Sequence, residues 1–249
     1  MQLQQFFERN PRFAVAFSGG VDSSYLLYAA NAADCDVHAY FIKSEFQPQF
    51  ELDEAINMAK KLGVTITVEN ISVLGEPNVY ENPADRCYHC KTAILKKLKE
   101  LALLDGYTVL CDGTNTDDDE TDRPGMRALK EQGVLSPLRE CGLGKTDIRY
   151  LSEKAGLSTF DKPAYACLAT RIPTGTAISQ DRLDKVERAE NALFNMGFSD
   201  FRVRLIPPDT AKLQLNSEQW EKAASLRWDI QKALEDDFKE IVLDLKSRG

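Results

Sequence analysis

The sequence predicts an α/β protein with a parallel, doubly wound sheet. The evidence is a regular alternation of apolar, strand-like runs with amphipathic, helix-like segments. The strand-like runs lie near 12–17, 36–42, 64–71, 107–111 and 134–138. The helix-like segments lie near 23–33, 50–62, 88–104, 122–132 and 145–155. Such alternation is typical of βαβ units, in which helices cover both faces of a parallel sheet.

The first strand-like run leads directly into the segment Ser18-Gly19-Gly20-Val21-Asp22-Ser23-Ser24, and a helix-like segment follows at once. A strand, a turn rich in Gly and Ser, and a helix N-terminus together favour a bound phosphate. The glycines allow positive φ and close backbone approach, while free N–H groups and the helix dipole attract an anion. The segment therefore predicts a nucleotide site.

Two common phosphate-binding patterns do not fit this chain. A Walker loop requires G-x-x-x-x-G-K-[ST], and Gly144-Lys145-Thr146 supplies its end, but Arg139 stands where the first glycine belongs. A dinucleotide fingerprint requires three spaced glycines, which SGGVDSS lacks. The segment instead resembles the PP-loop of the Rossmann-like ATP pyrophosphatases, which cut ATP between the α and β phosphates.

The PP-loop resemblance assigns roles to the residues of the loop. Ser18, Gly19, Gly20, Ser23 and Ser24 would hold the pyrophosphate half of ATP. Asp22, at the mouth of the loop, is the expected contact for Mg²⁺, because a cation that bridges the phosphates stabilises the pyrophosphate leaving group.

A second polar segment follows the strand-like run 107–111. In open α/β sheets, ligands bind beyond the carboxyl ends of the strands. Asp112, Gly113 and Thr114 are therefore expected to contact the nucleotide as well. The acidic run that starts at Asp117 is interpreted as a solvated loop, and the alternative is a loop that becomes ordered with metal and nucleotide.

Two cysteines, Cys87 and Cys90, lie at the start of the amphipathic helix predicted near 88–104. They fall within one helical turn, where the positive end of the helix dipole favours thiolates. Four interpretations of this cysteine pair are open: half of a zinc site, a redox dithiol, part of an iron–sulfur cluster, or a chance spacing. No second Cys-x-x-Cys follows, and Cys167 is the best candidate for a third ligand. Three protein thiolates on a [4Fe–4S] cluster would leave one iron open to carry a transferable sulfide.

After about residue 175 the pattern changes to helix, two strands, helix and strand, near 180–196, 201–206, 211–215, 217–235 and 238–245. We therefore expect a PP-loop domain over 1–175 and a smaller α+β domain over 176–249 for substrate binding or oligomerisation. Arg202 and Arg204 share one face of the first of these strands, and the pattern predicts either a solvated surface or a basic strip that suits a substrate phosphate. Glu190 lies on an apolar helical stripe, which predicts either a metal or substrate site or a salt bridge.

Composition narrows the possible partners. The net charge of −8 disfavours nucleic acid. No apolar run is long enough to span a membrane and no signal peptide is evident, so we expect a cytoplasmic protein without a membrane partner. The six cysteines are expected to be thiols, metal ligands or catalytic groups rather than disulfides. Among them, Cys35, Cys111 and Cys141 are expected to be structural.

Several motifs together resemble the LarE-type, ATP-dependent sulfur transferases, and the resemblance covers nearly the whole chain. The shared motifs, in order, are SGGVDSS, RCYHCK, CDGTN with DETDRPGMRAL, GVLSPL, LGKTDIR and KPAYACLATRIPTGT. The resemblance implies conversion of pyridinium-3,5-biscarboxylic acid mononucleotide to its bisthiocarboxylic form, on the route to the nickel-pincer nucleotide cofactor. It also implies ATP, Mg²⁺, a sulfide donor and a homo-oligomer.

The family has two sulfur sources, a sacrificed cysteine and a [4Fe–4S] cluster held by three cysteines. The sacrificed cysteine would fall at Ala166 in this chain, one position before Cys167. The resemblance therefore implies the cluster branch, with Cys87, Cys90 and Cys167 as ligands. Thr170 and Arg171 follow Cys167 and are expected to orient the activated carboxylate. In the sacrificial branch a second acidic metal ligand lies near the position of Gln214, so its absence here argues against such a metal site. For Arg123 we expect either a phosphate contact or a loop salt bridge.

Two other functions compete with this prediction. A cluster-dependent tRNA thiolase of the same superfamily can also use three cysteines, but the acidic charge and the absence of a basic tract in the sequence argue against it. A nucleotide-binding regulator could instead hold a structural zinc at Cys87, Cys90 and one further ligand.

Overall fold

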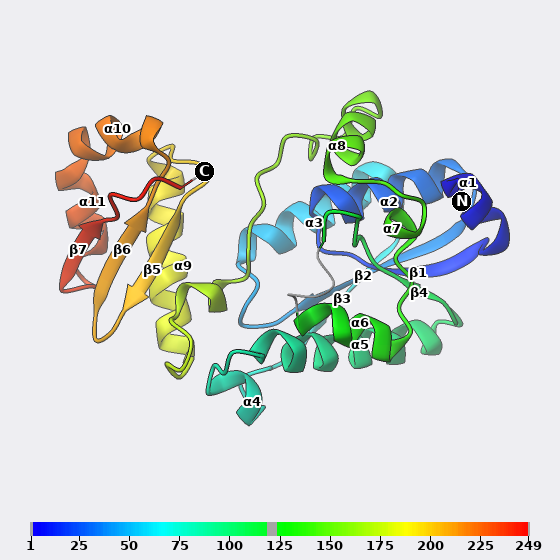
Figure 1. Cartoon of the computed structure of the whole chain (residues 1–249), viewed down its shortest axis with the longest axis horizontal. Coiled ribbons are helices and arrows are strands. Elements are labelled where there is room, and N and C mark those ends of the chain that lie inside the picture. Colours follow the sequence, from blue (N-terminus) through cyan, green and yellow to red (C-terminus); the bar gives the residue numbers. More distant parts are fainter. Residues whose placement is uncertain (1, 119–123, 249) are drawn as a thin grey trace. The chain divides into compact units, whose positions relative to one another are not determined.

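The computed structural model describes residues 2–118 and 124–248 and divides into two compact units (Figure 1). Unit 1 comprises Met1–Val73 and Asp85–Lys162, and unit 2 comprises Leu74–Ala84 and Pro163–Gly249. The boundary expected near residue 175 therefore lies inside unit 2. Unit 2 also takes in a short segment from the first half of the chain.

Unit 1 contains a four-stranded parallel sheet in the order β3-β2-β1-β4. The strands are β1 (Arg12–Ala16), β2 (Asp36–Lys43), β3 (Ile66–Asn70) and β4 (Leu110–Cys111). The helices are α1 (Leu3–Arg9), α2 (Val21–Ala32), α3 (Gln49–Leu62), α5 (Arg86–Leu104), α6 (Pro124–Gln132), α7 (Pro137–Glu140) and α8 (Lys145–Lys154). This architecture confirms the predicted α/β class.

Helices cover both faces of this sheet, because alternate residues of its buried strands point to opposite sides. Phe13 and Val15 face a core completed by α1, α2, α3, α7 and α8. Ala14 and Tyr40 face a second core formed with α5 and α6. Figure 1 shows α5 and α6 on one side of the strands, and α2, α3 and α8 on the other.

One predicted strand is wrong. In 134–138 the structure has only a single parallel bridge, between Leu135 and Cys111, and α7 begins at Pro137. Proline cannot donate a ladder hydrogen bond, and its fixed φ suits the first turn of a helix. The apolar run is therefore cut short at the edge of the sheet.

Unit 2 is an α+β structure with a three-stranded sheet in the order β5-β6-β7. Its strands are β5 (Arg202–Ile206), β6 (Thr210–Gln214) and β7 (Glu240–Leu243), with β5 and β6 antiparallel and β6 and β7 parallel. Its helices are α4 (Pro77–Tyr80), η1 (Leu168–Arg171), α9 (Gln180–Asn195), η2 (Ser217–Gln219), α10 (Trp220–Ser225) and α11 (Arg227–Leu234). The predicted order of helix, two strands, helical segment and strand is confirmed.

Among the described residues, none of the helices combines the length and the apolar character needed to cross a membrane.

Candidate functional site

The PP-loop lies between β1 and α2, at the carboxyl end of a central strand. Gly19 has a φ of 70°, in the left-handed region. A Cβ added there would lie 3.1 Å from the Cβ of Ala55, so both the conformation and the close approach require glycine. The serines hold the turn together: the hydroxyls of Ser18 and Ser23 are 3.0 Å apart, and Ser23 Oγ donates to the carbonyl of Gly20.

The start of α2 has the features of an anion site. Gly20 caps the helix without a side-chain hydrogen bond, which leaves the first backbone N–H groups of α2 without partners inside the helix. Asp22 Oδ1 and the buried Ser24 Oγ have no hydrogen-bond partner among residues 2–118 and 124–248. Because buried polar atoms normally have partners, these two atoms fit a bound phosphate and its cation.

Two lysines reach this loop from distant segments. Lys145 Nζ, at the start of α8, lies 2.6 Å from Asp22 Oδ2. Lys162 Nζ donates to the carbonyl oxygen of Gly19 at 3.1 Å and pairs with Glu54. The sequence analysis assigned neither lysine to the site; the Gly-Lys-Thr segment was the available signal for Lys145.

The segment after β4 packs directly on the PP-loop helix. A Cβ added to Gly113 would lie 2.7 Å from the backbone nitrogen of Ser23, so no larger residue fits there without movement. Asp112 is buried and accepts hydrogen bonds from Ser136 Oγ at 2.7 Å and from Thr114 Oγ1 at 2.5 Å. Asp112, Gly113 and Thr114 thus adjoin the PP-loop, and direct nucleotide contact stays a prediction for them.

Cys87 and Cys90 lie in the first turn of α5, as predicted, with Cys87 exposed and Cys90 half-buried. Arg86 Nη2 lies 3.5 Å from Cys87 Sγ, and its guanidinium carbon is 6.0 Å from the ring centroid of Phe46. Cys167 belongs to unit 2, so a site that joins the three cysteines stays a prediction.

The remaining cysteines are packing residues. Cys111 is fully buried in the core, and burial raises its pKa well above the ordinary range. Burial also raises the pKa values of Cys35 and Cys141, which pack against the same core. A raised pKa disfavours the reactive thiolate, which agrees with the structural role expected for all three.

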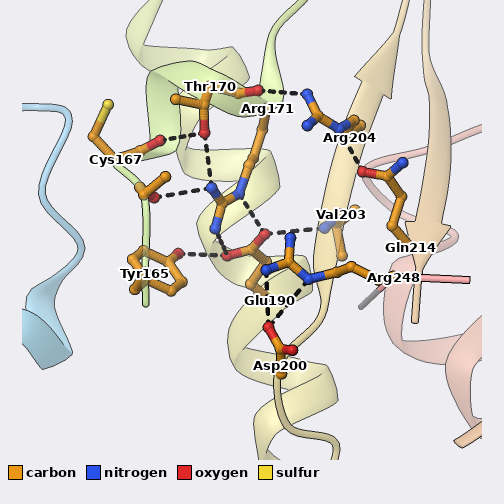
Figure 2. A network of polar contacts seen from close by, with 11 residues as sticks. Tyr165, Cys167, Thr170, Arg171, Glu190, Asp200, Val203, Arg204, Gln214 and Arg248 are labelled. Atoms are coloured by element: carbon orange, nitrogen blue, oxygen red, sulfur yellow. Dashed lines mark hydrogen bonds and ion pairs between the residues drawn. The ribbon is translucent and has the colours of Figure 1, made fainter. Parts of the chain in front are cut away.

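In unit 2 the turn that carries Cys167 is fixed by a polar network (Figure 2). Thr170 Oγ1 donates to the carbonyl of Cys167 at 2.8 Å. Arg171 donates through Nη1 to Thr170 Oγ1 at 2.8 Å and to the carbonyl of Ala166 at 2.9 Å. From the neighbouring strand, Arg204 Nη1 donates to the carbonyl of Thr170 at 2.8 Å. Side chains therefore hold this turn along its whole length.

Glu190 anchors the same network from α9. Its carboxylate pairs with the Nε and Nη2 atoms of Arg171 at 2.7 and 3.0 Å, and it also accepts from Val203 N–H and from the Tyr165 hydroxyl. Arg171 is 1% exposed and Glu190 is 2% exposed. Burial is the largest effect on Arg171 and opposes its charge, but the hydrogen bonds to Glu190 and the charge of Glu190 together outweigh burial and raise the pKa of Arg171. Of the two alternatives for Glu190, the structure shows a salt bridge, and contact of either residue with substrate stays a prediction.

A cluster of cationic side chains covers one face of the β5–β6 hairpin. Val203 and Leu205 face the core, while Arg202 and Arg204 lie on the opposite face, as predicted. Desolvation lowers the pKa of Arg202, and the charge of Arg248 lowers it further. Arg204 has a lowered pKa for the same reasons, with Arg171 contributing more than Arg248. Cations that repel one another in this way favour a nearby anion, and contact of Arg202 and Arg204 with a substrate phosphate stays a prediction.

Arg248 was missed in the sequence because it lies at the end of the chain, outside any periodic pattern. Its backbone N–H donates to the carbonyl of Leu215, and its Nε and Nη2 atoms donate to Asp200 Oδ1 at 3.1 and 2.8 Å.

Gln214 makes hydrogen bonds on the same face of the hairpin: Arg204 Nε donates to its Oε1, and its Nε2 donates to Asp244. The hydrogen bond from Gln214, followed by a contact with Lys212, lowers the pKa of Asp244 to about 2.

Arg123 and the acidic residues Asp119, Glu120 and Asp122 lie outside the described residues. Asp117 and Asp118 form part of the turn before them: Asp117 N–H donates to Asn115 Oδ1 at 2.8 Å, and Asn115 N–H donates to Asp118 Oδ2 at 3.0 Å.

A comparison with known protein-family models finds no match. An uncharacterized protein of Synechocystis sp. is 37% identical over 223 residues, which cover 87% of this chain and 81% of that protein. The pyridinium-3,5-bisthiocarboxylic acid mononucleotide synthase of Lactiplantibacillus plantarum is 33% identical over 206 residues, which cover 82% of this chain and 74% of the synthase. An uncharacterized protein of Methanocaldococcus jannaschii is 33% identical over 196 residues, which cover 79% of this chain and 75% of that protein.

A parallel α/β sheet with an SGGVDSS loop between its first strand and the next helix defines a Rossmann-like protein of the PP-loop class. Within that class, the similarity to the Lactiplantibacillus synthase extends over most of both chains. The chain therefore belongs to the LarE-type family of pyridinium-3,5-bisthiocarboxylic acid mononucleotide synthases, and it is an enzyme.

Proposed function

We propose that this enzyme is an ATP-dependent sulfur transferase that acts on pyridinium-3,5-biscarboxylic acid mononucleotide and replaces carboxylates with thiocarboxylates, in nickel-pincer nucleotide cofactor biosynthesis. The observation that carries the proposal is the similarity to the Lactiplantibacillus synthase, whose name specifies this product. The geometry of the PP-loop supports the ATP part, and the cationic face of unit 2 supports a substrate with a phosphate group.

In the first step, a carboxylate oxygen of the substrate forms a bond to the α phosphorus of ATP. The bond from that phosphorus to the oxygen it shares with the β phosphorus breaks, and its electron pair leaves with pyrophosphate. The N–H groups at the start of α2 would hold the phosphates, and Asp22 Oδ1 would bind Mg²⁺. Asp112, Gly113 and Thr114 would complete this nucleotide site.

In the second step, sulfide attacks the acyl carbon and the bond from this carbon to the oxygen of AMP breaks. AMP leaves with the original carboxylate oxygen, and a thiocarboxylate remains. Thr170 and Arg171 hold the backbone of the Cys167 turn during this step. No oxidant is needed, because sulfur enters and leaves the step in the same oxidation state.

The phosphate of the mononucleotide would bind to Arg202 and Arg204, with Arg248 as a third cation. Arginine suits this role because its planar fork can make two parallel hydrogen bonds to a phosphate. Asp200 holds Arg248 in place from the other side. The lowered pKa values of Arg202 and Arg204 agree with a face that gains stability when an anion binds.

Cys87, Cys90 and Cys167 would hold a [4Fe–4S] cluster, which would supply the sulfide for this reaction. Thiolates are the ligands such clusters require, and two of these thiols lie in one turn of α5 beside Arg86. A sulfide donor would reload the cluster, so the enzyme should turn over repeatedly.

A variant of Cys167 separates the two steps. Cys167→Ala should still exchange labelled pyrophosphate into ATP when substrate is present, but it should form no thiocarboxylate. Cys141→Ala is the control and should retain both activities. If Cys167→Ala also lost the exchange activity, Cys167 would have a structural role.

Metal analysis after anaerobic reconstitution tests the sulfur source. Bound iron and a broad visible absorbance that Cys87→Ala abolishes are expected. Stoichiometric zinc without iron would contradict the cluster and favour the zinc-containing regulator.

A further inference from the structure

A short segment from the first half of the chain, Leu74–Ala84, belongs to unit 2 and runs directly into α5 of unit 1. The first turn of α5 carries Cys87 and Cys90. The segment is therefore a covalent link between unit 2 and these two cysteines. The way unit 2 holds the segment bears on the point from which α5 begins.

Asn82 holds this segment within unit 2. Its side chain is buried, with the residue 1% exposed. The amide Nδ2 donates to the carbonyl oxygens of Ile172 at 3.3 Å and Pro173 at 2.8 Å. The backbone carbonyl of Asn82 accepts from Gly175 N–H at 2.8 Å. Side chain and backbone of one residue thus bind the same stretch, 172–175.

The backbone of Asn82 has a conformation that these contacts must maintain. Its φ is 58°, in the left-handed region, which asparagine adopts more readily than most residues. Pro83 follows, and a residue before proline prefers an extended backbone. The hydrogen bonds of Asn82, together with one from Ile178 N–H to the Tyr80 carbonyl at 2.7 Å, offset this cost. They fix the backbone where the chain continues toward α5.

The carbonyls that accept from Asn82 directly follow the turn that carries Cys167. The helix η1 spans Leu168–Arg171, with Cys167 at its N-cap and Ile172 at its C-cap. Cys167 therefore lies five positions before one end of this contact. Cys87 lies five positions after the other end. One side-chain amide joins the segments that lead to two cysteines far apart in the sequence.

We propose that Asn82 is a positioning residue, which sets the first turn of α5 so that Cys87 and Cys90 can share a cluster with Cys167. The inference rests on the proposed function, since it requires the three cysteines to bind one cluster. Asn82 acts through the backbone, by fixing the chain before Cys87 to the residues after the Cys167 turn. Loss of a residue that orients metal ligands typically weakens metal binding about 10–100-fold.

Cross-linking of thiols in the metal-free, full-length protein tests this positioning without sulfur transfer. Dibromobimane joins two nearby thiols, and mass spectrometry of the digested protein identifies the pair. In a Cys90→Ser parent protein, a cross-link between Cys87 and Cys167 is expected. Adding Asn82→Asp should reduce its yield about tenfold, because a carboxylate cannot donate to the two carbonyls.

Two controls separate positioning from a general loss of structure. Asn31→Asp is the matched control, because the Asn31 amide donates to a backbone carbonyl at 3.0 Å within unit 1. It should leave the yield unchanged. In a Cys167→Ser protein, Asn82→Asp should not change the cross-linking of Cys87 with Cys90, since both lie in the first turn of α5.

Loss of the cluster is the second readout. After anaerobic reconstitution with iron and sulfide, Asn82→Asp in the otherwise wild-type chain should lose its visible absorbance to a chelator about tenfold faster than the wild type. Its affinity for magnesium ATP should be unchanged, because the PP-loop lies in unit 1. Circular dichroism checks folding. Asn82→Gly, which adopts the left-handed conformation but lacks the amide, replaces the aspartate variant if that one is unfolded.

If either the cross-linking yield or the rate of cluster loss were the same with and without Asn82→Asp, the role of Asn82 would be overturned and the proposed function would stand. A wild type that bound no iron would give a different result: the cluster of the proposed function would fail, and this inference with it.

Discussion

At the residue scale, the buried pair of Arg171 and Glu190 determines how the Cys167 turn is held. A carboxylate on the apolar stripe of α9 was visible in the sequence as an anomaly. Its partner was not, because Arg171 lies in an irregular segment before the helix, where periodicity carries no information. The structure shows that the guanidinium links the helix to the backbone carbonyl of Ala166, so the ion pair serves the turn.

Glu190→Gln should lower the free energy of unfolding by about 3 kcal/mol, because it leaves the buried guanidinium of Arg171 without its counter-charge. Asp237→Asn is the matched control, since Asp237 pairs with the exposed Arg188, which lies on the same helix as Glu190, through two hydrogen bonds of 2.9 and 2.6 Å. The control substitution should lower the free energy of unfolding by at most about 1 kcal/mol. Urea unfolding followed by circular dichroism measures both. Equal losses would mean that burial adds nothing to the Arg171–Glu190 pair.

At the element scale, alternation and helical period predicted most of the fold. Four of the five strands expected in unit 1 are present, and the strands and helices of unit 2 follow the predicted order. The fifth expected strand failed because Pro137 ends the pairing after one bridge. Local pattern could not show that α8 would return to the PP-loop, because that contact joins residues far apart in the sequence.

The contact between Gly113 and the start of α2 gives a prediction for the PP-loop. Gly113→Ala should reduce affinity for magnesium ATP at least about tenfold and lower stability by about 1–3 kcal/mol, because the methyl group must displace the backbone of Ser23. Gly75→Ala is the control, since nothing lies within 4 Å of its added methyl group. It should change stability by less than about 0.5 kcal/mol. Calorimetry and thermal unfolding measure the two effects, and normal ATP binding by Gly113→Ala would refute the packing argument.

At the scale of the whole molecule, the two units carry different parts of the proposed chemistry. Unit 1 contains the PP-loop, Lys145, Cys87 and Cys90, and unit 2 contains Cys167 and the cationic face. The sequence predicted both sets from motifs and strand alternation, except for Lys145. It missed Arg248, because a residue beyond the last strand has no pattern to place it beside Arg202.

The central claim is that sulfur replaces a carboxylate oxygen after that oxygen has been adenylated. Substrate labelled with ¹⁸O in its carboxylates can be incubated anaerobically with the reconstituted enzyme, ATP, Mg²⁺ and sulfide, and all products then measured by mass spectrometry. The account predicts a pyridinium thiocarboxylate and AMP that carries one labelled oxygen for each sulfur transferred. Unlabelled AMP, or ADP in its place, would contradict it.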